Sequence, residues 1–198
     1  EPIPPYQRPP LSKAWLKGEA DADSLALKPL EFYAEHNIDF RPNLSALAIN
    51  RGAKTVSLSD GSEIGYDALI LATGARAIKL PVEGADLKGI LELRTAADAE
   101  ALKSALGPGK TIAIVGGGYI GLEAAASSRA LGAEAVVLER EPRLLARVAC
   151  VELSSFFQAY HEARGVKFEL GAGVVGFEGE SGKVTGVIPD FLKNKELA

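Results

Sequence analysis

The sequence predicts an α/β protein whose second half folds as a doubly wound parallel sheet. Apolar strand patterns alternate with helix patterns, in the order 111–115 (strand), 119–131 (helix), 135–139 (strand), 153–160 (helix) and 166–170 (strand). Gly132 and Gly165 follow the two helices and stop them. A glycine-rich turn joins the first strand to the first helix. Strands that alternate with helices in this way are typical of a parallel sheet covered by helices.

The composition is that of a globular protein and excludes several classes of function. Of the 198 residues, 47% are hydrophobic and 24% are charged, close to the average for soluble domains. The net charge is −4 and no stripe of Lys and Arg stands out, so we expect no nucleic-acid partner. No apolar run approaches the ~18 residues of a membrane span, so we expect no membrane partner. The single cysteine excludes a disulfide framework and a multi-thiol metal site, and favours the reducing cytoplasm.

The chain is expected to be a piece of a longer protein. It begins with Glu1, contains no methionine and lacks the charged and then apolar start of a signal peptide. At ~150 residues per domain, its length corresponds to one domain and a fraction of another.

The first half is expected to contain short elements and one buried strand. In order, these are a loop (1–10), a helix (29–37), a hairpin (55–64), a parallel strand (68–72) and a segment crossing between two domains (75–94). The loop follows from five prolines in its ten residues, which fix the backbone and remove donors. Asp60-Gly61 is a strong hairpin signal. The continuous apolar run that ends at Thr73-Gly74 is typical of a strand buried on both faces.

Other patterns in the second half are structural. Thr95 with Asp98 is expected to cap a helix that reaches Leu106, a hairpin is expected at 174–187, and the tail 188–198 has a weak helical pattern. Four residues share one face of the second doubly wound helix: Leu153, Phe156, Phe157 and Tyr160. The aromatic stripe of Phe156, Phe157 and Tyr160 is interpreted as core and not as a cofactor site.

Three residues with reactive side chains are given no catalytic role. Cys150 lacks a second thiol for a dithiol relay and is interpreted as a packing residue. His36 and His161 lie near predicted helix ends, without a nearby acid or nucleophile pattern, and are interpreted as cap or surface residues.

The motif that carries chemistry is the glycine-rich turn, which fits the spacing G-x-G-x-x-G: Gly116, Gly117, Gly118, Tyr119, Ile120 and Gly121. It joins a predicted strand to a predicted helix, as a dinucleotide fingerprint requires. Gly116 allows the tight turn, Gly118 lets a pyrophosphate approach, and Gly121 lets the helix lie close to the strand. Unpaired amides at the helix start would then hold the phosphates. The alternative is a tight turn that binds nothing.

Glu139 supplies the second half of the fingerprint, because it ends the next strand about 20 residues further on. Its carboxylate can accept hydrogen bonds from both ribose hydroxyls and would repel a 2′-phosphate, so NAD is favoured over NADP. Arg140 and Arg143 leave NADP open. The 92–187 region is therefore expected to be a Rossmann-like NAD-binding domain.

Three segments occur together in one order: 6–13 (YQRPPLSK), 69–76 (LILATGAR) and 115–123 (VGGGYIGLE). They resemble the FAD-dependent NADH reductases that serve [2Fe–2S] ferredoxins in bacterial oxygenase systems. The resemblance runs with little interruption from residue 1 to about 187. It implies a two-dinucleotide flavoprotein fold, with 1–91 as part of an FAD-binding domain, 92–187 as the NAD-binding domain and 188–198 as an altered junction or tail.

The resemblance also implies site residues for FAD. Positions beside the flavin are matched by Arg8, Pro9 and Lys13, and the loop that approaches FAD is matched by Ala72, Thr73, Gly74 and Arg76. Glu123 matches a glutamate that, in similar flavoproteins, pairs with the equivalent of Lys13 near the flavin N5. Lys13 and Glu123 are thus the candidate catalytic residues. The alternative is a solvated lysine and an acid that favours the helix dipole.

The implied reaction passes electrons from NADH through FAD to a [2Fe–2S] ferredoxin. Members of the resembled family begin with their own FAD fingerprint and end with a further domain, and neither is found in this sequence. Activity of the chain by itself is therefore not expected. The alternatives are a truncated, inactive nucleotide-binding fragment and an enzyme like the rubredoxin reductases.

Overall fold

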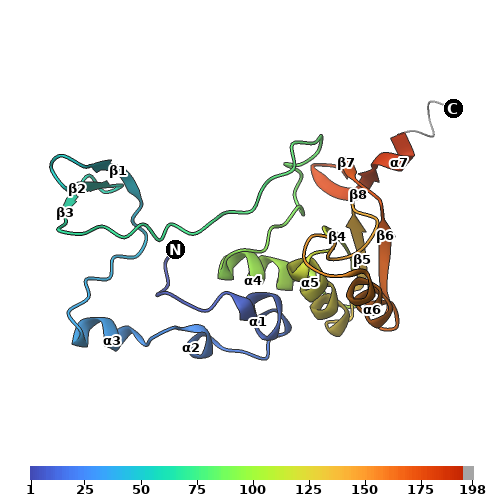
Figure 1. Ribbon diagram of the computed structural model, residues 1–198, viewed down its shortest axis with the longest axis horizontal. Helices are drawn as coiled ribbons and strands as arrows, with labels where there is room; N and C mark the ends of the chain where they lie inside the picture. Colours follow the sequence, from blue (N-terminus) through green and yellow to red (C-terminus); the bar gives the residue numbers. More distant parts are fainter. Residues whose placement is uncertain (194–198) are drawn as a thin grey trace. The chain divides into compact units, whose positions relative to one another are not determined.

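The computed structural model describes residues 1–193 and divides into two compact units (Figure 1). The first unit contains Glu1–Gln7 and Ala22–Arg76, and the second contains Arg8–Asp21 and the chain from Ala77 onward. The boundaries predicted for the two cofactor domains lie at 91/92 and 187/188. They describe which cofactor each part would bind and not which residues form a compact unit, so they stay predictions.

The first unit is built around a small antiparallel sheet. Its strands pair in the order β1 (Ala46–Asn50), β2 (Thr55–Leu58) and β3 (Glu63–Gly65). The predicted hairpin is confirmed, because Gly61 has φ +85° in the turn and the Ser62 amide donates to Asp60 (2.9 Å). Two short helices belong to the same unit, α2 (Ala22–Leu25) and α3 (Leu30–Glu35), and α3 confirms the helix predicted after Pro29.

The predicted strand at 68–72 is wrong. This segment has no regular secondary structure, and the side chains of Ile70 and Leu71 are 89% and 66% exposed. A strand needs a neighbour to pair with its backbone groups. Among residues 1–193 no strand pairs with this run, so the apolar composition does not produce a ladder.

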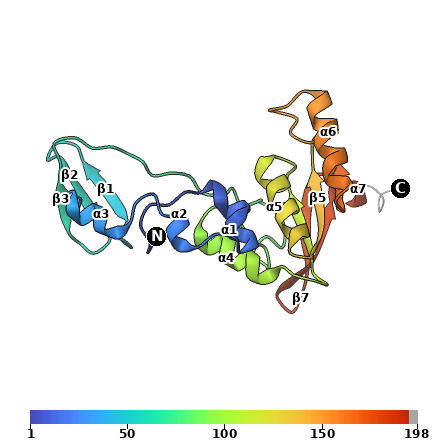
Figure 2. The same ribbon diagram turned by 90° about the horizontal axis from the view of Figure 1, so that it is seen from below.

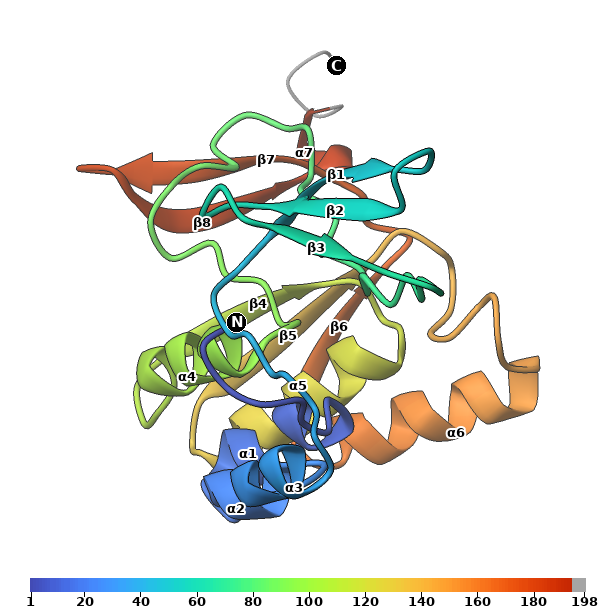
Figure 3. The ribbon, with the colours of Figure 1, turned by 90° about the vertical axis from the view of Figure 1, so that its left-hand side faces the viewer.

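The second unit contains the predicted doubly wound fold. Its parallel sheet has the order β4 (Thr111–Val115), β5 (Glu134–Glu139) and β6 (Val166–Leu170). Helices α5 (Tyr119–Ala130) and α6 (Val151–Glu162) connect these strands and lie on the same side of the sheet (Figure 3). The α/β fold class and all five elements of the pattern are confirmed.

The core of this unit lies between the sheet and its two helices. One cluster contains Ala125, Ala135, Val137 and Val166, all nearly or fully buried. A second cluster contains Leu122, Leu144 and Leu145, with Phe157 of α6 packed against it. Complete burial of one such aliphatic side chain contributes ~1.5–3 kcal/mol. Because both clusters include residues near the glycine-rich turn, the core holds that turn in place.

The remaining elements of the second unit surround this fold. They are η1 (Pro9–Ser12), α1 (Ala14–Lys17), α4 (Ala96–Ala105), β7 (Val174–Glu180), β8 (Lys183–Pro189) and α7 (Asp190–Lys193). Helix α1 contacts both α4 and α5 (Figure 2). The Thr95–Asp98 capping box and the β7–β8 hairpin are confirmed. Of the predicted tail, Ile188 and Pro189 belong to β8, α7 follows, and 194–198 lie outside the described residues.

The crossing segment predicted at 75–94 is irregular, as expected, but part of it is fixed to the β7–β8 hairpin. Glu83 and Lys88 form parallel bridges with Gly176 and Lys183. Gly84 has φ +77°, and a side chain there would overlap the Phe177 carbonyl. Through residue 193, no helix is long and apolar enough to cross a membrane.

Helix α6 buries a different face from the one predicted. Phe156 and Tyr160 are 59% and 45% exposed, whereas Ser154 and His161 are buried. The Ser154 hydroxyl donates to the Leu144 carbonyl (2.6 Å), which satisfies this polar group where it is buried. The interpretation of Phe156 and Tyr160 as core is therefore wrong, and only Phe157 of that set packs against the core. Cys150 is exposed, so its interpretation as a packing residue is also wrong.

His161 is a core residue rather than a surface residue. Its ring is 7% exposed and meets Phe168 edge-on (centroids 6.4 Å apart), so only His36, which is exposed beside the end of α3, fits the prediction. Burial, with a smaller contribution from the Arg164 charge, lowers the pKa of His161 below its usual value of 6.5.

We expect His161 to make folding sensitive to mild acid. Between its lowered folded pKa and its unfolded value near 6.5, the unfolded chain binds more protons, so stability is complete above this window and falls as the pH drops through it. The slope for one proton is at most ~1.4 kcal/mol per pH unit. Urea unfolding at pH 7.5, 6.5 and 5.5 measures it. His161→Phe should lose less stability than the wild type over this range, and equal losses would contradict the prediction.

Candidate functional site

The glycine-rich turn connects the end of β4 to the start of α5. The Gly116 amide donates to the Leu138 carbonyl (2.8 Å), which extends the pairing of β4 with β5 by one residue. Gly116 has φ +111°, a region that favours glycine, and Gly118 is the N-cap of α5. The turn therefore delivers the chain directly into a helix of 12 residues whose first amides have no partner within the helix.

The shape of the turn fits a dinucleotide pyrophosphate. A Cβ on Gly121 would overlap the carbonyl oxygen of Gly116, so the helix lies against the turn only because position 121 is glycine. A Cβ on Gly118 would meet nothing within 4 Å. The backbone is therefore open at position 118, where a phosphate must approach, and closed at position 121, where helix and strand pack. Tyr119 and Ile120 are exposed in the first turn of α5.

Glu139 lies at the end of β5 and is tied to the turn. The Gly117 amide donates to Oε2 of Glu139 (2.6 Å), and the Glu141 amide donates to Oε1 (2.8 Å). These bonds fix the carboxylate beside the glycine-rich turn while leaving lone pairs on both oxygens for ribose hydroxyls. The neighbouring Arg140 side chain is 82% exposed and lies 3.6 Å from Glu141.

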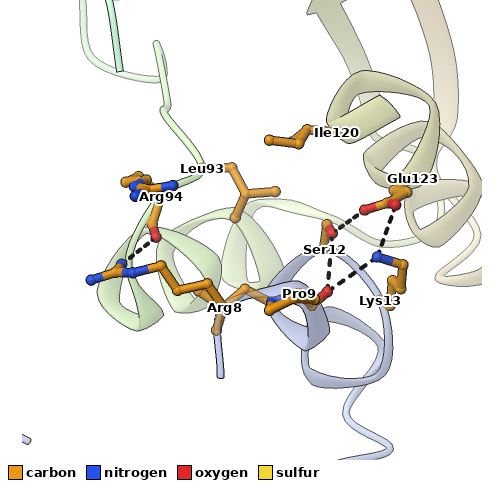
Figure 4. A pocket seen from close by; sticks show the side chains of 9 residues that line it. Arg8, Pro9, Ser12, Lys13, Leu93, Arg94, Ile120 and Glu123 are labelled. Atoms are coloured by element: carbon orange, nitrogen blue, oxygen red, sulfur yellow. Dashed lines mark hydrogen bonds and ion pairs between the residues drawn. The ribbon is translucent and has the colours of Figure 1, made fainter. Parts of the chain in front are cut away.

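The predicted pairing of Lys13 with Glu123 is present in the structure. Lys13 Nζ lies 2.8 Å from Oε1 of Glu123, and the side chains are 49% and 31% exposed (Figure 4). Lys13 follows η1, and Glu123 lies in the second turn of α5. The packing of η1 and α1 on α5 brings these two residues together across the sequence. A pair this exposed contributes little to stability, and its predicted catalytic role stays a prediction.

Ser12 belongs to the same cluster and was missed by the sequence analysis. Its hydroxyl donates to Oε2 of Glu123 (2.6 Å), so both carboxylate oxygens are engaged. The Ser127 hydroxyl, one turn further along α5, donates to the Ser12 carbonyl (2.7 Å). The only signal in the sequence was the position of Ser12 next to Lys13, and a serine alone does not indicate a site.

This cluster lines a pocket of about 280 Å³ in the second unit. Its walls combine basic and apolar side chains: Arg8, Pro9, Leu11, Ser12, Lys13, Leu93, Arg94, Ile120 and Glu123. Arg8 donates to the Arg94 carbonyl (2.7 Å) (Figure 4). A concave site that combines apolar side chains with placed polar and charged groups is the usual form of a site for a small molecule or cofactor. Arg8, Pro9, Lys13 and Ile120, all predicted cofactor residues, thus share one pocket.

The other predicted FAD residues belong to the first unit. They are Ala72, Thr73, Gly74 and Arg76, all exposed and in irregular backbone. Gly74 has φ +69°, a backbone conformation that favours glycine. Their role toward FAD stays a prediction. In the described part of the chain, no three His, Cys, Asp or Glu side chains are placed to hold a metal ion.

Comparison with known proteins gives consistent matches. Residues 1–195 match the family described as pyridine nucleotide-disulphide oxidoreductase. The probable ferredoxin reductase CtmF of Castellaniella defragrans is 50% identical over 183 residues, 92% of this chain and 45% of that protein. The rubredoxin-NAD(+) reductase of Pseudomonas putida is 41% identical over 184 residues, 93% of this chain and 48% of that protein.

A solved structure matches as well. The crystal structure of a covalent putidaredoxin reductase–putidaredoxin complex superposes with a TM-score of 0.91 at 38% identity, over 96% of this chain and 46% of that one. The chain spans about half the length of the curated relatives it matches.

Proposed function

Because the chain belongs to the pyridine nucleotide-disulphide oxidoreductase family, we propose that it functions as an FAD-dependent reductase that passes electrons from NADH to a [2Fe–2S] ferredoxin of an oxygenase system. The observation that carries the proposal is the glycine-rich turn with Glu139 fixed beside it. Proteins of this family and the similar ferredoxin reductases use FAD and NAD(H).

Residues of the second unit act at two places, the glycine-rich turn and the pocket beside Lys13. Amides at the start of α5 hold the pyrophosphate of NADH, and Glu139 accepts hydrogen bonds from the ribose hydroxyls. Lys13, paired with Glu123, places a positive charge in the pocket, where the apolar side chains of Leu93 and Ile120 also face a bound ring. When bound, FAD supplies the conversion between a two-electron donor and a one-electron acceptor. The protein supplies position and electrostatics.

The ferredoxin partner is supported by the names of the relatives. CtmF is described as a probable ferredoxin reductase, and the solved complex contains putidaredoxin. A rubredoxin partner is the second candidate, since the Pseudomonas putida relative is a rubredoxin reductase at 41% identity. Reduction of a purified ferredoxin and a purified rubredoxin by NADH, in the FAD-loaded protein, distinguishes these partners. The cytoplasmic location stays a prediction.

NADH titration by calorimetry, in the wild type and in Gly118→Trp, tests the proposed nucleotide site. The indole would occupy the open space at position 118, where no protein atom lies within 4 Å of a Cβ, so the fold should tolerate it. We expect NADH affinity to fall about tenfold, or ~1.4 kcal/mol.

Equal affinity in the two proteins would contradict the assignment of the site. The remaining alternative is an inactive nucleotide-binding fragment. Such a fragment would be purified without flavin and would be colourless. Retained yellow flavin together with NADH-dependent dye reduction would exclude it.

A further inference from the structure

Arg143 lies in the loop between β5 and α6, and its guanidinium is directed toward the protein's own backbone. Nη1 donates to the Ala149 carbonyl (2.8 Å), and Nη2 donates to the Ala146 carbonyl (2.8 Å). Nη1 also donates to the Ser154 hydroxyl (2.7 Å) of α6. The planar fork of an arginine is suited to holding several acceptors at once. The side chain thus binds the 144–149 loop at its middle and at its C-terminal end, and links it to α6.

The 144–149 loop in turn holds the glycine-rich turn. The Leu145 amide donates to the Gly117 carbonyl (3.1 Å), while the Gly117 amide is held by Glu139. Leu145 is buried and has φ +53°, a conformation that is rare for a branched side chain and persists only when its surroundings enforce it. The Leu144 side chain packs so closely on Gly117 that a Cβ there would lie 2.6 Å from its Cδ2.

The hydrogen bonds that surround Leu145 are connected to Arg143. The amides of Val148 and Ala149 both donate to the Leu145 carbonyl (2.9 Å each), and the Ala149 carbonyl is held by Arg143. The Ser154 hydroxyl, which accepts from Arg143, donates to the Leu144 carbonyl (2.6 Å). Arg143 therefore bonds directly to groups that follow Leu145, and through the Ser154 hydroxyl it is linked to the carbonyl that precedes Leu145.

We propose that Arg143 is a positioning residue for dinucleotide binding. It keeps the 144–149 loop in the one conformation that fixes Gly117, and it does not contact the nucleotide's 2′-position. This inference rests on the proposed nucleotide function and deepens it. It replaces the possibility, left open by the sequence, that Arg143 recognises the 2′-phosphate of NADP.

Arg143→Lys tests the proposal, because lysine keeps the charge and loses the fork. Hydrogen exchange by mass spectrometry compares a peptide that spans 116–121, in which the Gly116 and Gly117 amides are hydrogen-bonded, with β6 in the ligand-free chain. We expect about tenfold faster exchange of these two amides and unchanged exchange in β6, the effect of losing about one hydrogen bond to a charged group. Calorimetry should show similar weakening, about tenfold, for NADH and NADPH.

Arg164→Lys is the matched control. Its guanidinium also donates to a carbonyl, that of Tyr160 (2.9 Å), but lies at the other end of α6. Exchange in 116–121 should remain at the wild-type rate. Should Arg143→Lys fail to fold, Ser154→Ala removes two bonds of the same network and should produce the same local change.

Several outcomes would overturn the proposal. These are exchange in 116–121 that stays at the wild-type rate, exchange that rises equally in β6, and weakening confined to NADPH. Failure of the wild type to bind NADH would instead count against the proposed function, and the exchange measurement on the ligand-free chain would still decide the role of Arg143.

Discussion

Gly121→Ala should abolish most NADH binding and destabilise the second unit, although it adds a single methyl group. The new Cβ would overlap the Gly116 carbonyl, so α5 must move away from the turn. Overpacking of this kind costs ~1–3 kcal/mol of stability. A displacement of about 1 Å in a binding site can cost roughly a hundredfold, so we expect NADH affinity to fall by about that factor. Urea unfolding and calorimetry measure the two effects.

Gly118→Ala is the matched control, because the same methyl group there meets open space and φ is −82°. We expect its stability to lie within about 0.5 kcal/mol of the wild type. If both substitutions reduced stability equally, the close approach of α5 to the Gly116 carbonyl would not be the cause.

Lys13→Met should slow the reduction of bound flavin by NADH about a hundredfold while leaving NADH affinity unchanged. Lys13 is the cation of the pocket that pairs with Glu123, and methionine preserves most of its volume without the charge. Removal of one fixed electrostatic group from a site where charge develops typically costs ~10²–10³ in rate. Stopped-flow absorbance in the FAD-loaded protein measures the rate, and calorimetry measures the affinity.

Lys17→Met provides the comparison for this substitution. Lys17, the last residue of α1, forms an ion pair with Glu19 (2.6 Å) but does not line the pocket. It should leave the rate unchanged. A hundredfold loss in both variants, or in neither, would remove the special role of Lys13.

Local signals predicted most of the second unit. Strand and helix periods, the stops at Gly132 and Gly165, and the Thr95–Asp98 cap depend on residues close in sequence, so they can be recognised without a structure. The glycine-rich turn was predicted for the same reason. The conformation of Gly116 and the close approach at Gly121 follow from adjacent residues.

Predictions that depended on distant partners were less successful. Residues 68–72 have the composition of a strand, but a strand forms only where another strand can pair with its backbone. On α6, the polar Ser154 is buried, with its hydroxyl bound to the Leu144 carbonyl, and Phe156 is exposed, the reverse of what apolar periodicity predicts. Apolar periodicity indicates that a helix is amphipathic. It does not indicate a hydrogen bond formed by a polar residue beside the apolar stripe.

In the candidate site, too, local patterns do not predict contacts between residues that are distant in sequence. The pairing of Lys13 with Glu123 joins residues far apart in sequence, and it was predicted from resemblance rather than from any periodicity. Ser12 and Ser127 complete the cluster through bonds between η1 and α5, and no pattern within either element indicates them. The contribution of Arg143 lies in its backbone acceptors, which a sequence does not display.

Helix α5 carries residues of both proposed sites. Its first residue follows the glycine-rich turn, and Glu123 lies one turn later, bonded to Ser12 and Lys13. A rise of ~1.5 Å per residue places Glu123 only about 6–8 Å along the axis from the helix start. Because one continuous helix joins the two places, any shift of the start of α5 would also shift Glu123. The distance between the two proposed sites is therefore fixed by the length of one helical turn.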